Sequence, residues 1–556
     1  MNQLSQLLDA LYFTASHLAK SRLLRDYLAH TPDPDRGWVI AALAGQLTFP
    51  FFKRNTIKQL ILERTDPVLF QLSYDYVGEM SETVAHLWPA QPDPQFVMPS
   101  VGELVNTLQH APKNEVEPYL IHLLNNFTPT QRWSLLKLGS GGLRVGLSAR
   151  RLKQILAEYG QVDVAEIENL WHGLTPPYTD LLHWLEGRGD KPDMSNKLVF
   201  HPVLLAHPLQ ADDIEKLDFS EYLVEAKYDG IRVQIVVKHT DMGLEKALFS
   251  RTGDDISGAF PDVLDRFSLP GVFDGELLAF KDGEISSFND LQQRLNKKKP
   301  SKKLQAQYPC GLILYDILTL SENSTDERNG SQVNHRDLTH LPLHNRQQML
   351  TETLAQSALA NEHLIRQSEV FSVADAAELT ALRESICRDP NGYIEGLMLK
   401  RKNSLYTAGR PKGIWYKYKR DAQLVDAVIM YAQRGSGKRS SFYSDFTFGL
   451  WIKELSEDGT PSARLLPIGK AYSGFTDKEL KALDKWVRQN TIGRFGPVKE
   501  VAKALVFEVA FDAAHSSKRH KSGVALRFPR IHRIRWDKPA AEADQLIEFK
   551  QLHAIT

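Results

Sequence analysis

The chain has 556 residues, of which 42% are hydrophobic and 24% charged, and its 68 basic residues balance its 68 acidic residues. This length exceeds what one core supports, so about three domains of an ordinary globular protein are expected. The neutral balance excludes a protein that is basic over its whole surface, and the only cysteines, Cys310 and Cys387, exclude a disulfide framework and a cysteine-rich zinc site.

Residues 1–190 are expected to form an all-α domain, because leucines recur at helical spacing and glycine and proline are mostly confined to the joints. The joint at 138–148 is rich in glycine, which lets a backbone approach a phosphate closely; a plain turn between helices is the alternative. Ser148 is a candidate N-cap for a helix over 149–159. The polar stretch 186–193 has the composition of a domain linker.

An α+β domain is expected over residues 198–420, where short β-rich runs replace the helical pattern. In its central stretch, Asp229-Gly230 predicts a tight turn between two strands and places Lys227 at the end of the first strand. Taken alone, this stretch could be only a hairpin with a charged tip. The polar residues 322–337 are expected to form a surface loop or an insertion.

The last strand of this region, 414–419, alternates aromatic and basic residues. Its two tyrosines are therefore expected on one face, and Lys417 and Lys419 on the other. Residues 422–556 contain several short β-rich runs with one helical segment between them, which predicts an all-β domain with the OB fold. The fold class expected for the whole chain is therefore multidomain.

Six short motifs occur in order along the middle of the chain: Lys227-Tyr228-Asp229-Gly230, Ser250-Arg251, Asp274-Gly275-Glu276, Tyr315-Asp316, Glu395-Gly396 and Trp415-Tyr416-Lys417-Tyr418-Lys419. Together they resemble the adenylation domain of ATP-dependent DNA ligases, which are covalent nucleotidyltransferases. A seventh motif, Arg535-Trp536-Asp537-Lys538 after 527–530, resembles the last ligase motif, on the OB domain. The helical third, including 141–146, resembles the DNA-binding domain of the larger bacterial and archaeal ligases.

The resemblance implies that the protein seals nicks in duplex DNA with ATP, through an AMP-lysine on Lys227 and then a DNA adenylate. An ordinary lysine amine has a pKa of ~10.4 and is protonated at neutral pH. Burial and the cations Lys417 and Lys419 are expected to activate the nucleophile. Mg²⁺, with Mn²⁺ as the alternative, is the expected metal, and Glu395 and Glu276 are its expected ligands.

The resemblance implies further nucleotide contacts from carboxylates, cations and one aromatic ring. They are Glu225, Arg232, Arg251, Glu276, Tyr315, Arg410, Lys417, Arg535 and Lys538. Tyr315 would stack on adenine, and Glu276 would accept hydrogen bonds from the ribose hydroxyls. Arg535 and Lys538 would orient the pyrophosphate. Packing alone explains Tyr315 equally well, and a carboxylate beside glycine, as at Glu276, is also an ordinary turn feature.

Three arginines are expected to bind DNA: Arg144, Arg294 and Arg439. The first lies in the glycine-rich joint, and the others lie in the basic stretches 294–303 and 434–439. Such stretches supply local positive charge, although most charge runs are only solvated surface. Contacts to sugar and phosphate are expected, because a ligase must seal any sequence.

Two positions depart from the family pattern. Tyr315 stands where the family often has phenylalanine, and Trp536 stands where a charged residue is common. An RNA ligase or a capping-type nucleotidyltransferase would keep the chemistry and change the substrate. A non-catalytic protein that binds nicked DNA on a ligase scaffold is an alternative from another class.

The expected partners are ATP and nicked duplex DNA, and the protein is expected to be a monomer in solution. Residues 1–5 lack the basic and apolar parts of a signal peptide, and no apolar run reaches the length of a membrane span. A reducing cytoplasm, at the nucleoid when the protein is bound to DNA, is therefore the expected location.

Overall fold

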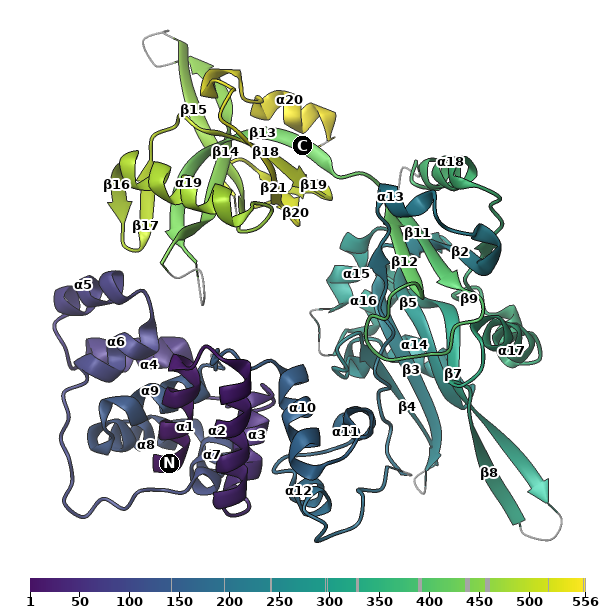
Figure 1. Cartoon of the computed structure of the whole chain (residues 1–556), viewed down its shortest axis with the longest axis horizontal. Helices are drawn as coiled ribbons and strands as arrows, with labels where there is room; N and C mark the ends of the chain where they lie inside the picture. Colours follow the sequence, from purple (N-terminus) through teal and green to yellow (C-terminus); the bar gives the residue numbers. More distant parts are fainter. Residues whose placement is uncertain are drawn as a thin grey trace. The chain divides into compact units, whose positions relative to one another are not determined.

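The computed structural model describes residues 1–556 except 142, 195, 241–242, 296, 298, 327–329, 389–392, 436–440, 456–460, 519, 554 and 556. The chain divides into two compact units, residues 1–152 with 421–556 and residues 153–420. Figure 1 labels the elements along the chain. Among the described residues, no helix combines the length and the apolar character that crossing a bilayer requires.

The described part of the chain up to residue 185 contains helices and no strand, as the sequence predicts (Figure 1). The helices are α1 (Asn2–Phe13), α2 (His17–His30), α3 (Asp35–Leu43), α4 (Arg54–Leu62), α5 (Pro67–Val77), α6 (Met80–Leu87), α7 (Val101–His110), α8 (Lys113–Asn126), α9 (Pro129–Gly139), α10 (Ala149–Gly160), α11 (Val164–Trp171) and α12 (Thr179–Leu185). In α1, Leu4, Leu7, Leu8 and Leu11 recur on one face and are all buried. Packing of such apolar faces therefore stabilises this helical domain.

The described residues of the glycine-rich joint between α9 and α10 are held by α2. The Lys20 ammonium of α2 donates a hydrogen bond to the Val145 carbonyl, and a Cβ at position 146 would press against this ammonium. Ser148 accepts a hydrogen bond from the Arg151 backbone N–H at 3.2 Å, which confirms that Ser148 caps α10. Arg144 lies exposed on this fixed joint.

The central domain is built on two sheets. One has the strand order β1-β12-β11-β2-β10, and the other has the order β4-β3-β5-β7-β8 with β6 and β9 at its sides. The strands are β1 (His207–Pro208), β2 (Tyr222–Tyr228), β3 (Ile231–Thr240), β4 (Gly243–Ser250), β5 (Gly271–Lys281), β6 (Glu284–Ile285), β7 (Cys310–Asp326), β8 (Gly330–Asp337), β9 (Ile365–Gln367), β10 (Val370–Phe371), β11 (Ile394–Arg401) and β12 (Trp415–Lys419). The helices are α13 (Ala211–Ile214), α14 (Pro261–Arg266), α15 (Phe288–Leu295), α16 (Lys302–Gln307), α17 (Leu343–Ala355) and α18 (Ala376–Ile386).

The strands on either side of Asp229-Gly230 do not form the hairpin that the sequence suggests. β2 pairs with β10 and β11, whereas β3 pairs with β4 and β5, so the two strands belong to different sheets. Val224 of β2 packs in one core, and Ile235 of β3 packs in another. The Asp-Gly pair bends the chain as predicted, but burial of separate apolar faces decides the strand pairing. The chain therefore crosses between the sheets immediately after Lys227.

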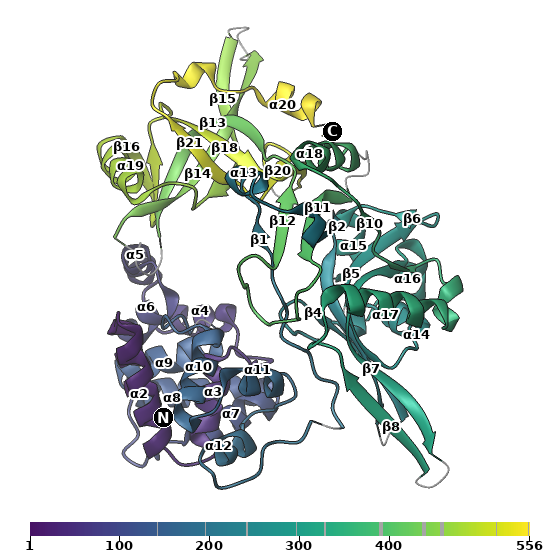
Figure 2. The same cartoon turned by 45° about the vertical axis from the view of Figure 1, so that its right-hand side comes forward.

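The polar segment 322–337 is also not a plain loop. Most of it extends β7 and forms β8, and the two strands run together as a long antiparallel hairpin (Figure 2). The facing backbone groups of a two-stranded ribbon pair with each other and the outer ones bind water, so the ribbon does not require the apolar composition by which a buried strand is recognised in a sequence.

The C-terminal domain is a β half-barrel of the OB type, as the sequence predicts. Its main sheet has the order β15-β14-β13-β17-β16, with β18 against β13 and β21 against β18, and β19 pairs with β20. The elements are β13 (Gln423–Arg434), β14 (Tyr443–Leu455), β15 (Pro461–Ala471), α19 (Asp477–Gln489), β16 (Thr491–Phe495), β17 (Val498–Val501), β18 (Val506–Phe511), β19 (Ala513–Ser516), β20 (Val524–Arg527), β21 (Arg530–Arg535) and α20 (Leu546–Leu552). Phe446, Phe448 and Phe507 lie fully buried in the core of this domain.

Candidate active site

Three neighbouring strands of the five-stranded sheet bring two lysines to one carboxylate. Lys227 lies on β2, Glu395 on β11 and Lys419 on β12. Glu395 Oε1 lies 2.6 Å from Lys227 Nζ, and its Oε2 lies 2.8 Å from Lys419 Nζ. One carboxylate therefore bridges two ammonium groups whose residues are almost two hundred positions apart in the sequence.

A β-bulge aims Glu395 at these lysines. The register of β11 against β2 slips by one residue between Ile394 and Gly396, so Glu395 is an extra residue in the ladder. Gly396 has a φ of +151°, and a Cβ at this position would collide with the backbone of β12. The backbone thus requires glycine directly after Glu395, which accounts for the Glu-Gly pair of the motif.

The second sheet contributes Glu276 to the same place. Gly230, where the chain crosses between the sheets, lies so close to Glu276 of β5 that a Cβ on Gly230 would overlap its side chain. Burial raises the pKa of Glu276 to about 7, against the attraction of Lys227 and Arg232 and with a further contribution from the charge of Glu395. Glu276 is therefore a carboxylate that changes its charge near neutral pH.

The raised pKa of Glu276 predicts how the stability of the metal-free protein depends on pH. The pKa is about 7 in the folded chain and 4.5 in the unfolded chain, where the carboxyl group is solvated, so the wild type loses stability relative to Glu276→Gln between these two pH values. The free energy of unfolding is expected to fall by about 2 kcal/mol between pH 5 and 7. One pH unit corresponds to at most ~1.4 kcal/mol in this window, and the slope is smaller near each of the two pKa values. Thermal unfolding of both proteins in the presence of a chelator measures this difference.

The matched control for this pH dependence is Glu245→Gln, which removes an exposed carboxylate from the same domain. Its unfolding temperature is expected to follow that of the wild type at every pH. If Glu276→Gln also follows the wild type in parallel from pH 5 to 7, the raised pKa of Glu276 is wrong.

Lys417 lies within a group of positive side chains. Burial lowers the pKa of Lys417, and the cations that lower it further are Lys419, Lys227, Arg410 and Arg251.

Tyr416 and Tyr418 pack on the core of the five-stranded sheet, so the predicted alternation along β12 is confirmed. Arg251 and Arg410 are exposed at the surface, where they can meet the phosphates of a ligand.

The loop that carries Arg251 is held from two sides. Ser250 Oγ lies 3.0 Å from Thr252 Oγ1, and both hydroxyls are hydrogen-bonded to Asp254. Gly253 has a φ of +85°, and a Cβ there would collide with the His172 ring. Burial lowers the pKa of His172 to about 4, so this ring packs against the loop in its neutral form at physiological pH.

Arg232 is anchored by the protein itself. Its guanidinium donates to Asp274 Oδ2 at 2.6 Å, to the Leu204 carbonyl at 2.5 Å and to the Tyr406 hydroxyl at 3.2 Å. Asp274 is fully buried and also accepts hydrogen bonds from Gln234 and Tyr406. The structure therefore places Arg232 in an internal network of hydrogen bonds. Most residues of this network lie far apart in the sequence, so sequence analysis alone does not connect them.

Glu225 and Tyr315 meet at Lys400, a residue to which the sequence assigned no role. Lys400 Nζ lies 2.8 Å from Glu225 Oε2 and 4.0 Å from the centre of the Tyr315 ring. Gln347 donates to the other Glu225 oxygen at 2.8 Å. Lys400 and Glu225 are each only 1% exposed. One signal for Lys400 is visible in the sequence, since a lysine within the apolar run of β11 requires a buried partner.

The carboxylates of the site fit a magnesium ion. The described residues contain no group of three or more His, Cys, Asp and Glu side chains arranged to hold a metal. Mg²⁺ commonly takes only one or two carboxylates and fills its other positions with water and substrate phosphates. Glu395 and Glu276 lie in each other's electrostatic field and offer the oxygen ligands that this ion prefers.

The two cations of the last motif lie on the C-terminal domain and share a carboxylate. Arg535 NH1 lies 3.2 Å and Lys538 Nζ 2.7 Å from the same oxygen of Asp426, on β13. Arg535 also binds Asp537 at 2.9 Å. Both cations are thus paired internally in this structure.

Comparison with known proteins identifies the family. Residues 203–419 match the ATP dependent DNA ligase domain, and residues 439–538 match the ATP dependent DNA ligase C terminal region. A "Probable DNA ligase" of Koribacter versatilis is 32% identical over 455 residues, which cover 78% of this chain and 74% of that protein. The chain belongs to the ATP-dependent DNA ligase family. This ligase therefore uses ATP and acts on nicked DNA.

Other relatives agree with this assignment. "DNA ligase 1" of Korarchaeum cryptofilum is 29% identical to this ligase over 453 residues, which cover 79% of this chain and 75% of that protein. A solved structure described as "Pmar-Lig_PreS3" has a TM-score of 0.56 at 16% identity and covers 96% of this chain and 99% of that chain. At this identity the solved structure supports the fold alone.

The three arginines predicted to bind DNA have different surroundings in this ligase. Arg144 is exposed, and Arg439 lies outside the described residues. Arg294 is fully buried, where its guanidinium binds Asp262 and donates to the carbonyls of Ala259 and Tyr308. A side chain held in this way is a core residue, so the structure gives no support to a direct contact between Arg294 and DNA.

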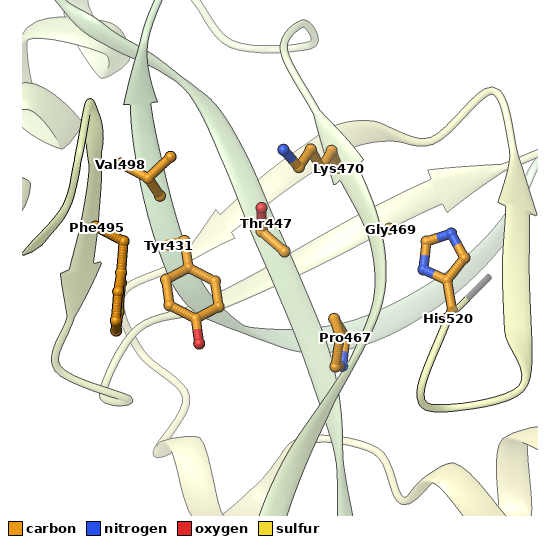
Figure 3. Close-up of a pocket in the computed structure, with 8 residues that line it drawn as sticks. All are labelled: Tyr431, Thr447, Pro467, Gly469, Lys470, Phe495, Val498 and His520. Carbon is orange, nitrogen blue, oxygen red and sulfur yellow. The ribbon is translucent and has the colours of Figure 1, made fainter. Parts of the chain in front are cut away.

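The C-terminal domain of the ligase also has a cavity of about 480 Å³ on the face of its main sheet. Figure 3 shows the rings of Tyr431 and Phe495 at one end of this cavity, His520 at the other end and Lys470 between them. The two aromatic rings meet edge to face at 6.2 Å, and Phe495 is 62% exposed. Exposed aromatic rings beside cations are typical of nucleic-acid-binding surfaces on OB folds.

Proposed function

We propose that this ligase seals nicks in duplex DNA in three steps, with a covalent lysyl-AMP on Lys227 as the first intermediate. One observation carries this proposal: Lys227, Glu395, Lys419 and Glu276 come together from two sheets around the end of β2. In the first step the Lys227 amine attacks the α-phosphate of ATP, a P–N bond forms, the bond to pyrophosphate breaks, and pyrophosphate leaves.

The two carboxylates have different parts in activating Lys227. Burial acts to raise the pKa of Glu395, but Lys227 and Lys419 outweigh burial and hold the pKa below its usual value. Glu395 is thus a stable anion that positions the amine and a poor acceptor for its proton. In the absence of metal Glu276 has a pKa of about 7, so it is the neighbouring carboxylate whose proton affinity suits an acceptor at neutral pH. A metal ion bound to Glu276 would lower this proton affinity, so Glu276 would take up the proton only while it does not bind the metal.

Charge that develops on the α-phosphate is stabilised by the side chains around Lys417. Lys417 and Lys419 project from one face of β12, and Arg251 and Arg410 lie exposed within the same positive field. Fixed cations of this kind contribute more to the transition state than to the bound substrate. Tyr315 and Glu225 support the nucleotide-binding surface from the interior, through Lys400.

Glu395 and Glu276 would hold the metal, for which Mg²⁺ is proposed and Mn²⁺ is a substitute with the same preference for oxygen ligands. When bound, the metal supplies positive charge that offsets the charge of the triphosphate.

The C-terminal domain would assist the first step through Arg535 and Lys538, which orient the pyrophosphate. The boundary between the two compact units falls between Arg420 and Asp421. This position supports a hinge at residues 420–422. The C-terminal domain would rotate about this hinge after adenylation and would then hold the DNA.

In the second and third steps AMP passes to the 5′-phosphate of the nick, and the 3′-hydroxyl then displaces it. The proposed contacts for the duplex are the exposed Arg144, the basic stretch 434–439 and the aromatic cavity at Tyr431 and Phe495. These contacts would be largely independent of base sequence and sensitive to salt, because cations meet phosphates. We also propose that the ligase acts as a monomer in the cytoplasm.

Nick sealing with matched substrates tests the proposed substrate. The full-length ligase with ATP and Mg²⁺ is expected to join a nicked DNA duplex and to join nicked RNA at least ~10-fold more slowly, since a tenfold preference needs only ~1.4 kcal/mol. Gel separation of labelled strands measures both rates. Faster sealing of RNA would favour the RNA-ligase alternative. Tight binding of nicked DNA without adenylation at saturating ATP would favour a non-catalytic binding protein.

A further inference from the structure

Asp426 on β13 holds both cations of the last motif with a single oxygen atom. Its Oδ2 lies 2.7 Å from Lys538 Nζ and 3.2 Å from Arg535 NH1. Its other carboxylate oxygen is buried and has no hydrogen-bond partner among the described residues. Asp426 thus offers these cations one anionic oxygen and leaves its other carboxylate oxygen without a hydrogen bond.

The position of Asp426 does not depend on its charge. Its backbone N–H donates to Asp544 Oδ2 at 2.9 Å, and its carbonyl accepts from the Asp544 N–H at 3.0 Å. β13 is also paired along its length with β18. An asparagine at position 426 would keep the backbone contacts and the shape of the side chain and would remove only the charge.

The other carboxylates near these cations engage them less completely. Within the described part of the chain, Asp537 forms an ion pair with Arg535 and not with Lys538, and its side chain is 69% exposed. Glu508 lies 3.9 Å from Arg535 and is also bound by His532 and Arg533. Among the described residues, Asp426 is therefore the carboxylate that holds both Arg535 and Lys538.

We propose that Asp426 is a built-in competitor of pyrophosphate for Arg535 and Lys538. This inference rests on the proposed function, in which these two cations orient the pyrophosphate. Asp426 holds the cations in place between turnovers and gives them up when the phosphate oxygens arrive, because a phosphate binds an arginine fork with two oxygens and carries more charge. After the first step Asp426 takes the cations back, which weakens pyrophosphate binding and opposes reversal of adenylation.

Reversal of the first step tests the competition directly. A pyrophosphate oxygen attacks the phosphorus of the lysyl-AMP, the P–N bond to Lys227 breaks, ATP forms, and the released amine takes up a proton. The full-length, pre-adenylated ligase is mixed with increasing pyrophosphate, and the concentration for half-maximal loss of AMP is measured. For Asp426→Asn this concentration is expected to fall about fivefold, the equivalent of ~1 kcal/mol for a partly exposed ion pair.

Asp512→Asn is the matched control, because Asp512 forms a comparable pair with Arg530 at 3.0 Å on the same domain. Its half-maximal pyrophosphate concentration is expected to equal that of the wild type. A value for Asp426→Asn that is unchanged or higher than that of the wild type overturns the proposal. Failure of both Asp426→Asn and Asp426→Ala to fold overturns it as well, because Asp426 would then be a structural residue.

Two further variants separate this proposal from the proposed function. If Arg535→Ala and Lys538→Ala leave the pyrophosphate dependence unchanged, these cations do not bind pyrophosphate, and their assignment in the proposed function fails. If the two variants weaken pyrophosphate binding and Asp426→Asn does not strengthen it, the cations keep their assigned role and only the competition by Asp426 fails.

Discussion

Replacing Lys227 with alanine is expected to reduce formation of the covalent AMP adduct by at least ~10³-fold, because the change removes the amine that is proposed to attack ATP. The ligase is incubated with ATP labelled at the α-phosphate, and the protein-bound label is measured after denaturation. Acid should release the label from the wild type and alkali should not, because the expected bond joins phosphorus to an amine.

The same Lys227→Ala variant should still seal nicked DNA that already carries AMP on its 5′-phosphate. That step requires the phosphate-binding cations and the metal but no lysine nucleophile. Lys216→Ala is the control, because Lys216 is an exposed lysine in the same part of the chain. An AMP adduct that persists in Lys227→Ala would show that another residue is the nucleophile.

Replacing Glu395 with glutamine is expected to slow adenylation by about 10²–10³-fold. Glutamine keeps one acceptor oxygen, but an NH₂ donor replaces the other oxygen and the charge that attracts Lys227 and Lys419, at 2.6 and 2.8 Å in the wild type, is lost. The variant would also present a weaker site to a hard divalent cation. Single-turnover rates of adduct formation at increasing Mg²⁺ measure both effects.

The control for Glu395→Gln is Glu221→Gln, which removes the charge of a surface carboxylate that binds Arg401 at 2.8 Å. An exposed pair of this kind contributes little, so adenylation by the control should match that of the wild type. A wild-type rate for Glu395→Gln, with an unchanged dependence on Mg²⁺, would remove Glu395 from the mechanism.

The site could be predicted because its motifs follow one another along the sequence in a recognisable order. The sequence does not show which of the strands that carry these motifs pair with each other in the sheets. The run around β2 predicts a strand and a bend, but the partners of β2 are decided by which core its buried face joins. The link between Glu225 and Lys400 spans 175 residues, and sequence spacing gives no measure of such a distance in space. Long-range ion pairs therefore remain beyond sequence reasoning.

The prediction that Arg294 contacts DNA fails for a different reason, because the sequence itself contains a signal that Arg294 is buried. It lies beside a run of lysines and resembles part of a DNA-binding surface. Arg294 also follows Leu291 by three residues, so the two share one face of α15, and both are fully buried. Helical periodicity thus separates an interior arginine from the exposed lysines next to it, whereas composition does not.

The crossing at Asp229-Gly230 gives the central domain an unusual mechanical property. Each sheet has a core of its own, and the two sheets also share a core in which Trp415 of β12 packs with Val272 of β5. Lys227 belongs to one sheet and Glu276 to the other. Any sliding of one sheet over the other would change the spacing of the reacting groups. In the proposed mechanism ATP contacts residues of both sheets, so a bound nucleotide would hold Lys227 and Glu276 at a fixed distance from each other.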